Sequence, residues 1–414
     1  MLYQLRRRAM RYAAAGAGAA ATGGLCTYCN GATAAGVLPE YEKKGLRARA
    51  VRTLTPLRDG FYGKEIDVLG LPVRAHAVVS DPALVVAADR LARMLRNMPA
   101  AVSERLARRG AAFHIIGIGQ ATSDLPEHAH MKGVDGGYTG EKGVTLDQRA
   151  RGMGGVHSSC GEENLIDLDS DPRYAGCDIL THEFAHCIMD VGLPPTLRAA
   201  ILETYHESVE VQGRWRREDG SRAYAGSNAS EYFAELTMWY FGTHGEFVDA
   251  KQQQPPPGPG GLAAYDPDGF KLLAAIYNGT HPALSEADPP SVRLDPLNLD
   301  DPTTGHSVEE EEIASSLVLM EFDNRGCDCA WRLYWLDARG ERRQYAEVPR
   351  DAALVQQTFP GHVWHLVAAA ADQTAGVAAA TSTRELRYAA KPGACVANVS
   401  DDARCRRVKA LSAN

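Results

Sequence analysis

The stretch Asp178-Ile-Leu-Thr-His-Glu-Phe-Ala-His-Cys-Ile-Met-Asp190 places His182 and His186 four residues apart, with Glu183 between them. On a helix, positions i and i+4 lie on one face, so both imidazoles can bind one Zn²⁺ while Glu183 points at a water on the open side of the metal. The flanking residues are mostly apolar, which predicts a buried helix. Buried histidines need partners such as a metal. The alternative is a surface helix with two solvated histidines.

A zinc site of this kind needs a third protein ligand, and the best candidate lies further along the chain. Glu231 and Glu235 are one helical turn apart within an aromatic-rich run. Two carboxylates on an otherwise apolar helical face are costly unless a cation compensates them. We therefore expect Glu231 to bind the metal and Glu235 to accept the second N–H of a ligand histidine. An exposed glutamate pair on an amphipathic helix is the alternative, and His206 and Glu207 are rival ligands.

Together, His-Glu-Phe-Ala-His and the later Tyr-x6-Glu-Tyr-Phe-Ala-Glu resemble the anthrax lethal factor-like zinc peptidases, which include the Pro-Pro endopeptidases. The resemblance covers roughly residues 45 to 285. It implies a single zinc ion as cofactor, Glu183 as general base, and Tyr224 as a residue that stabilises the tetrahedral oxyanion or assists the leaving amine. It also implies a supporting carboxylate at Glu235 and three metal ligands, namely His182, His186 and Glu231.

Length and composition fit more than one globular domain. The chain has 414 residues, of which 45% are hydrophobic and 23% are charged. These are ordinary values for globular protein, and a single core would be unusual at this length. The formal net charge of -8 provides no basic surface, which argues against nucleic acid as a partner.

The N-terminal segment has the polarity of a targeting sequence. Four arginines precede an Ala/Gly-rich run within residues 1–40, and no acidic residue occurs before Glu40. This pattern is typical of a secretory signal, so a secreted, extracellular protein is expected. A mitochondrial transit peptide, a membrane anchor through this segment and a plain disordered tail are the alternatives. The run is too short and too poor in Leu, Ile and Val for a clear membrane span.

Changes in sequence pattern divide the rest of the chain. A stretch rich in Pro, Asp and Ser follows the helical patterns, and alternation with period two begins at Ile313. We predict an α+β chain, in which a mainly helical zincin-type peptidase domain is followed by a small all-β sandwich. The predicted bounds are a targeting or disordered segment at 1–40, the peptidase domain at 41–285, a linker at 286–311, the sandwich at 312–391 and a tail at 392–414.

Two further features concern the Gly-rich run and the cysteines. Residues 149–164 are expected to form an ordered loop beside the cleft, because no Gly-Lys-Ser/Thr follows that would indicate a phosphate-binding loop. Nine cysteines cannot all pair within one chain. In an oxidising compartment, the candidate disulfides are Cys395–Cys405 and a further bridge from among three others, Cys160, Cys177 and Cys187, but the sequence does not determine the connectivity.

Residues 322–325, 334–337 and 358–364 resemble the β-domain of the von Hippel-Lindau tumour suppressor, over about residues 312 to 370. In that family an aromatic-walled pocket recognises 4-hydroxyproline. The resemblance implies that the ligand hydroxyl would bond to Thr358, which replaces the usual Ser, and to His362, between three aromatic walls: Trp335, Tyr345 and Trp364. A core filled by the same aromatics is the alternative. No helical domain for a ubiquitin-ligase adaptor follows, so no such adaptor is expected as a partner.

The combined prediction is a secreted zinc metalloendopeptidase whose C-terminal β-domain docks a protein or peptide substrate, proline- or hydroxyproline-rich. Zn²⁺ lowers the pKa of its bound water to about 7, which lets Glu183 act as the general base. One alternative is a non-catalytic hydroxyproline- or peptide-binding protein with an inactive peptidase domain. Another is a structural surface protein in which the histidine motif is fortuitous.

Overall fold

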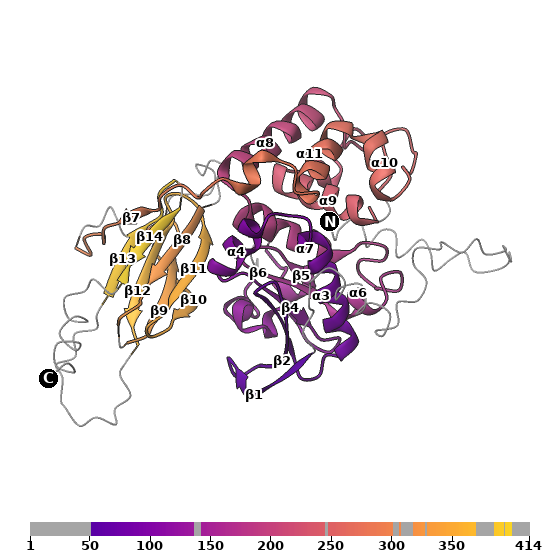
Figure 1. The fold of residues 1–414 in the computed structure, drawn as a ribbon. Helices are drawn as coiled ribbons and strands as arrows, with labels where there is room; N and C mark the ends of the chain where they lie inside the picture. Colours follow the sequence, from indigo (N-terminus) through magenta and orange to yellow (C-terminus); the bar gives the residue numbers. More distant parts are fainter. Residues whose placement is uncertain are drawn as a thin grey trace, which may run out of the picture. The chain divides into compact units, whose positions relative to one another are not determined.

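The computed structural model of the chain describes residues 51–135, 142–244, 247–300, 306–307, 318–327, 329–369, 385–392 and 394–399. These residues form both helices and sheets, as the α+β class requires. The chain divides into a first unit, residues 1–126 and 131–286, and a second unit, residues 127–130 and 287–414 (Figure 1). The predicted targeting segment, residues 1–40, lies outside the described residues.

The first unit contains a six-stranded sheet in the order β1-β2-β3-β4-β6-β5. Strands β3, β4 and β6 run parallel, whereas β1, β2 and the edge strand β5 pair antiparallel. Strand β4 is buried along its whole length because its sequence, Ala-Phe-His-Ile-Ile, is almost entirely apolar. The strands are β1 (Arg52–Arg58), β2 (Tyr62–Val68), β3 (Leu71–His76), β4 (Ala112–Ile116), β5 (Gly152–Met153) and β6 (His157–Gly161).

Helices of the first unit pack on the sheet and on one another. Helix α3 contacts β2 and β3, and α7 contacts β5 and β6. Helix α7 also packs against α9, one of the helices α8 to α11 that group together in Figure 1. The helices are α3 (Asp81–Leu95), α4 (Ala100–Arg108), α5 (Leu146–Arg149), α6 (Glu162–Ile166), α7 (Ile179–Cys187), α8 (Pro195–Tyr205), α9 (Ala229–Phe241), α10 (Gly258–Tyr265) and α11 (Pro267–Tyr277).

Short helical turns extend or link these helices. The π-helical turns η3 (Ile188–Gly192) and η4 (His206–Val211) continue α7 and α8 directly. Four 3-10 turns lie between other elements: η1 (Thr122–Asp124), η2 (Pro126–Met131), η5 (Tyr224–Gly226) and η6 (Pro282–Ser285).

Side-chain caps fix where α7 and α9 begin. Asp178 accepts a hydrogen bond from the Thr181 N–H at 3.1 Å and pairs with Arg90 at 2.8 Å, so α7 begins at the next residue. Asn228 accepts from the Glu231 N–H at 2.9 Å at the start of α9. Such caps satisfy N–H groups that have no partner within the helix and contribute about 0.5–2 kcal/mol each. They also set the faces on which the later side chains lie.

The second unit contains two four-stranded sheets, ordered β10-β9-β12-β13 and β11-β8-β14-β7. Side chains from both sheets share one buried core, which includes Phe322, Trp331 and Trp364. The strands are β7 (Val292–Leu294), β8 (Val318–Asp323), β9 (Trp331–Leu336), β10 (Arg342–Val348), β11 (Ala353–Thr358), β12 (Val363–Ala368), β13 (Glu385–Ala389) and β14 (Cys395–Asn398).

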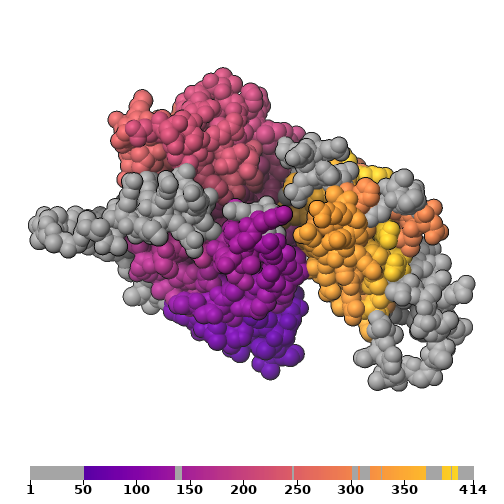
Figure 2. Space-filling view, turned by 180° about the vertical axis from the view of Figure 1, so that it is seen from behind, coloured from indigo at the N-terminus to yellow at the C-terminus, as the bar shows by residue number. Residues whose placement is uncertain are grey.

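Strands β7 and β14 lie in the stretches predicted as linker and tail. They pair in parallel with each other, and β14 also pairs in parallel with β8. Figure 2 accordingly shows orange and yellow residues, which are distant in sequence, side by side on the surface of this unit. Strands of three and four residues are too short to give a readable alternation, which is why the sequence pattern missed them.

The predicted disulfides are wrong. Cys160 and Cys187 are buried thiols, and burial raises the pKa of both. Cys395 is a thiol whose Sγ donates to the Lys391 carbonyl at 3.0 Å rather than half of a disulfide, and Cys405 lies outside the described residues. Among the helices that the structure describes, none combines the length and the apolar character needed to cross a bilayer.

Candidate metal centre

The three predicted metal ligands converge from two helices. His182 and His186 lie one turn apart on α7, and their Nε2 atoms are 3.2 Å apart. Glu231, in the first turn of α9, brings Oε2 to 3.2 Å from His182 Nε2 and 3.5 Å from His186 Nε2. The packing of α7 against α9 therefore joins residues that are 45 positions apart in sequence.

The donor set fits a metal ion such as Zn²⁺. Tetrahedral zinc with ligand distances of about 2.0–2.1 Å holds its ligand atoms roughly 3.3 Å apart, close to the three separations observed. Glu231 Oε2 is buried and makes no hydrogen bond of good geometry within the described chain. A buried carboxylate oxygen left in this state is costly unless a cation compensates it. The residues thus suit a cation at their centre.

A second set of bonds orients the two histidine rings. Glu235 Oε1 lies 3.0 Å from His182 Nδ1, and Ser230 Oγ lies 2.8 Å from His186 Nδ1. Partners on Nδ1 fix the tautomer and turn Nε2 toward the shared centre. The position of Glu235 is the one expected from the sequence. Ser230 was missed, because a serine near the start of a helix carries no signal beyond that of capping.

Glu183 lies between the two histidines on α7 and lines the same cleft. Burial raises the pKa of its carboxyl group, and the two neighbouring histidines offset part of that rise. A carboxylate with a raised pKa is a better proton acceptor than an ordinary surface glutamate. The side chain is therefore suited to take a proton from a water inside the cleft.

The Gly-rich run lets the edge strand β5 approach α7 closely. A Cβ atom at Gly152 would lie 2.6 Å from Ile179 Cγ2 and 3.1 Å from Glu183 Oε1. A Cβ atom at Gly154 would lie 2.7 Å from the Cβ of His186. Side chains at these positions would collide with the helix that bears the histidines. These glycines allow the run to pack closely beside the cleft, as expected, but the run forms strands β5 and β6 and the start of α6 rather than the predicted loop.

Tyr224, in the short turn η5, lies beside the ligand histidine. Its ring is 6.0 Å from that of His182 between centroids, with an angle of 26° between the planes. Burial, and then the negative charges of Glu231 and Glu183, raise the pKa of its phenol. The hydroxyl therefore keeps its proton at neutral pH and can act as a hydrogen-bond donor.

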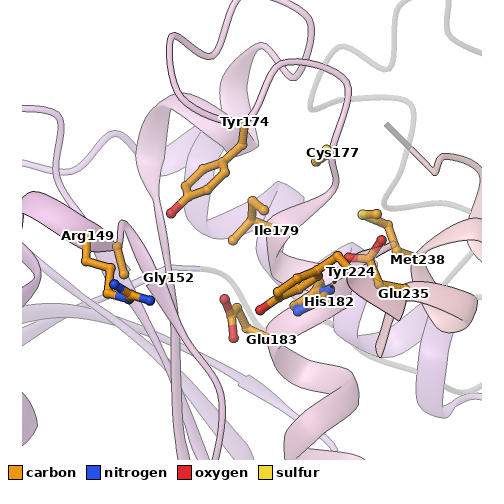
Figure 3. A pocket seen from close by; sticks show the side chains of 11 residues that line it. Arg149, Gly152, Tyr174, Cys177, Ile179, His182, Glu183, Tyr224, Glu235 and Met238 are labelled. Atoms are coloured by element: carbon orange, nitrogen blue, oxygen red, sulfur yellow. Dashed lines mark ion pairs between the residues drawn. The ribbon is translucent and has the colours of Figure 1, made fainter. Parts of the chain in front are cut away.

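The cleft beside these residues has a cavity volume of about 110 Å³. Figure 3 shows Glu183 near its centre, with Tyr224, His182 and Glu235 on one side and Arg149 on the other. Helix α7, strand β5, turn η5 and helix α9 all contribute lining residues. The rival ligands His206 and Glu207 are exposed in η4 and belong to neither the cleft nor the metal cluster.

The residues of the predicted hydroxyproline pocket also meet, within the second unit. Trp364 Nε1 donates to Thr358 Oγ1 at 2.9 Å, and Thr358 Oγ1 lies 3.2 Å from His362 Nδ1. The rings of Trp335 and His362 are 5.2 Å apart, and those of Tyr345 and Trp364 are 5.1 Å apart. Trp364 and Thr358 are almost fully buried, which agrees with the alternative of a filled core.

Polar atoms of this aromatic cluster are only partly satisfied. Trp335 Nε1 and His362 Nε2 are buried and have no hydrogen-bond partner among the described residues. Burial lowers the pKa of His362 to about 4, so its imidazole is neutral at physiological pH. When Thr358 donates to Nδ1, Nε2 carries the ring proton. The cluster then offers two N–H donors to an acceptor.

Comparisons with known proteins add little to this geometry. No family model matches the chain, and no curated protein matches it. Among solved structures, the chain is similar to the Pro-Pro endopeptidase PPEP-2 of Paenibacillus alvei, with 19% sequence identity and a TM-score of 0.34. The match covers 49% of this chain and 96% of that endopeptidase. A likeness of this strength assigns neither a fold nor a function to the chain.

Proposed function

We propose that this chain is a zinc-dependent endopeptidase that hydrolyses peptide bonds in protein or peptide substrates. The observation that carries the proposal is the convergence of His182, His186 and Glu231 in a cleft that also contains Glu183 and Tyr224. Two imidazoles and a carboxylate leave a fourth zinc position for the reaction, as catalytic zinc sites require. Zn²⁺ is the single cofactor proposed.

Each residue then has a distinct task. When bound, Zn²⁺ supplies a Lewis acid that polarises a carbonyl group and lowers the pKa of water. Glu183 takes the proton from the attacking water and passes it to the leaving amine. Tyr224 O–H donates a hydrogen bond where negative charge develops on the carbonyl oxygen. Glu235 and Ser230 hold the two imidazoles in the orientation that directs Nε2 inward.

Metal analysis and digestion of a peptide library test this proposal. The purified chain is expected to contain one zinc ion and to cleave peptides, and a chelator should abolish cleavage. Replacing the base by Glu183→Gln should lower kcat by about 10²–10⁴-fold while zinc remains bound. Full activity of this variant, or a wild-type chain without zinc, would refute the mechanism. Bound zinc without cleavage of any peptide would favour the binding protein with an inactive peptidase domain.

We also propose that the second unit binds a proline- or hydroxyproline-containing segment. Two buried N–H donors, Trp335 Nε1 and His362 Nε2, support this reading, together with the rings of Tyr345 and Trp364. A prolyl ring packs on aromatic faces, and an acceptor hydroxyl would satisfy donors that are otherwise left unpaired. Matched peptides containing Pro or hydroxyproline, titrated against the full chain, test this idea. Equal affinity for both peptides would exclude hydroxyproline recognition.

Secretion is the location that we propose. The Arg-rich and then Ala/Gly-rich segment at residues 1–40 supports it, and that segment lies outside the described residues. Expression of the full chain in a secreting host should release protein that lacks this segment into the medium. Retention in the cell with an intact N-terminus would instead favour one of the other readings of the segment.

A further inference from the structure

A fully buried carboxylate joins several elements of the first unit. Asp266 lies between α10 and α11, and its side chain is 0% exposed. Its Oδ2 atom accepts hydrogen bonds from Ser208 Oγ at 2.6 Å, Tyr232 O–H at 2.8 Å and Trp215 Nε1 at 2.9 Å. The three donors lie in η4, in α9 and in the segment between η4 and η5. One oxygen atom thus links three elements that are separate in sequence.

Helix capping alone does not account for this carboxylate. Its Oδ1 atom accepts from the Gly269 N–H at 3.1 Å and so caps α11. An uncharged Ser, Thr or Asn would serve as a cap without the cost of burying a charge. The Arg214 guanidinium compensates that charge only from 3.4 Å. A carboxylate, however, accepts several bonds at once, and stronger ones than a neutral oxygen accepts. The anion therefore suits the convergence of donors rather than the cap.

The bond from Tyr232 fixes the helix that carries a metal ligand. Tyr232 directly follows Glu231 on α9 and is 1% exposed. Successive residues of a helix point about 100° apart, so the two side chains occupy neighbouring faces of α9. Rotation of α9 about its axis would break the bond to Asp266. The same rotation would move Glu231 Oε2 from its positions at 3.2 Å and 3.5 Å from the two histidine nitrogens.

The bond from Trp215 fixes the turn that carries Tyr224. The Trp215 carbonyl accepts from the N–H of Ala223, directly before Tyr224, at 2.7 Å, and its own N–H donates to the Tyr265 hydroxyl at 3.1 Å. Trp215 has a φ of 60°, in the left-handed region that bulky residues rarely adopt. Such a conformation persists only where surrounding bonds impose it. The bond from Nε1 to Asp266 is one of these, so the carboxylate helps to place η5.

We propose that Asp266 is a positioning residue of the metal centre, which sets Glu231 through Tyr232 and sets Tyr224 through Trp215. Asp266 itself does not line the cleft. The two links control different quantities. Because Glu231 is a metal ligand, the link through Tyr232 determines zinc affinity. Because Tyr224 acts on the developing oxyanion, the link through Trp215 determines kcat, and this half of the inference rests on the proposed peptidase function.

Replacement of the carboxylate tests both links together on the full chain. Asp266→Ala should lower zinc affinity, measured by competition with a chelator, by about 10- to 100-fold, as for loss of a group that orients a ligand. At saturating zinc, kcat should fall by up to about 10²-fold, as for a misplaced catalytic group. Asp266→Asn should recover part of both, because its amide oxygen can still accept bonds at the Oδ2 position.

Variants that remove one donor each separate positioning from simple loss of stability. Tyr232→Phe should lower zinc affinity about 10-fold while kcat at saturating zinc stays within about twofold. Trp215→Phe should lower kcat at saturating zinc about 10-fold while zinc affinity stays within about twofold. Ser208→Ala is the matched control, because it removes a donor to the same oxygen from η4, which contributes no described residue to the cleft or the metal cluster. It should keep both quantities.

Each outcome decides the matter, and urea unfolding with circular dichroism shows that each variant is folded. Unchanged zinc affinity in folded Asp266→Ala would overturn the proposal. So would zinc affinity and kcat that fall together in all three single-donor variants, in proportion to lost stability. If Asp266→Ala does not fold, the single-donor variants decide alone. If the wild-type chain binds zinc but cleaves no peptide, the peptidase proposal fails, while zinc affinity in Tyr232→Phe and Ser208→Ala still tests the link to Glu231.

Discussion

The metal cluster of the first unit and the aromatic cluster of the second unit both assemble residues from separate elements, but their polar atoms behave differently. In the metal cluster, Glu231 Oε2 and the Nε2 atoms of His182 and His186 converge to 3.2–3.5 Å. In the aromatic cluster, the Thr358 hydroxyl is already bonded to its Trp364 and His362 neighbours, and only Trp335 Nε1 and His362 Nε2 lack a partner among its described polar side-chain atoms. Three converging atoms from metal-ligating residue types suit a cation, whereas a hydroxyl that bonds to its neighbours stabilises a core by itself. The first cluster is therefore the stronger indication of a ligand.

Removal of the Glu231 carboxylate should have the largest effect, because it should abolish both zinc binding and hydrolysis. Glu231→Gln keeps the shape of the side chain but removes the anion that joins α9 to the histidines. We expect zinc to be lost on dialysis and hydrolysis to fall below detection, because two imidazoles alone hold Zn²⁺ weakly. Zinc is measured by elemental analysis, and cleavage with a peptide substrate.

The matched control for that variant is Glu207→Gln, which changes the exposed rival ligand in η4. This control should keep both zinc and activity. Stoichiometric zinc in Glu231→Gln, or loss of zinc in Glu207→Gln, would show that Glu231 is not the third metal ligand. The metal cluster would then be no stronger an indication of a bound ligand than the aromatic cluster.

A smaller effect is expected where α7 is anchored. Asp178→Asn removes the charge that pairs with Arg90 at 2.8 Å and leaves that guanidinium, largely buried, without its partner. Breaking a buried pair costs about 3–5 kcal/mol of unfolding free energy. Urea unfolding of the first unit measures the loss. A loss below about 1 kcal/mol would mean that the metal cluster does not depend on this anchor.

The same pair predicts a pH dependence. Burial alone would raise the pKa of Asp178, but the charge of Arg90 and the bonds from Thr181 hold it below the ordinary value. A carboxyl group with a lowered folded-state pKa stabilises the fold above its unfolded pKa, near 3.9, and loses that contribution as pH falls through the folded value. The difference between wild type and Asp178→Asn should thus be complete at pH 7 and shrink below about pH 4. A difference that is constant with pH would contradict this assignment.

Substitution of Ser230 tests how much the orientation of the His186 ring contributes to zinc affinity. Ser230→Ala removes the bond at 2.8 Å to His186 Nδ1 while Glu231 stays in place. Loss of such a supporting partner typically weakens metal binding by about 10–100-fold. Competition with a zinc chelator measures the affinity, and Ser230→Thr, which keeps a hydroxyl, should recover most of it. Unchanged affinity in Ser230→Ala would mean that packing alone orients the ring.

The sequence predicted the parts of the molecule whose geometry is local. His182 and His186 follow from helical spacing, and Glu235 from the rule that a ligand imidazole needs a second partner. Ser230 could not be found, because its role depends on how α9 packs against α7. The hydrophobic pattern of the sequence does not indicate how separate elements pack together.

The same limit applies to the second unit. Strands β7 and β14 extend one sheet from stretches that were expected to be linker and tail, and they pair across about 100 residues of sequence. Short strands gain their stability from the partner rather than from their own pattern. The predicted disulfides failed for a related reason, since cysteine spacing does not report which thiols face one another.

The smallest predicted effect lies in the aromatic cluster. Thr358→Val keeps the shape of the side chain but leaves the buried Trp364 Nε1–H without its acceptor at 2.9 Å. An unsatisfied buried donor costs about 1–3 kcal/mol, so the second unit should unfold at lower urea while zinc content stays unchanged. Tryptophan fluorescence follows the transition, and Thr53→Val, on the exposed strand β1, provides the control. If Thr358→Val instead leaves stability unchanged and abolishes binding of a hydroxyproline peptide, the hydroxyl serves a ligand and the contrast between the two clusters disappears.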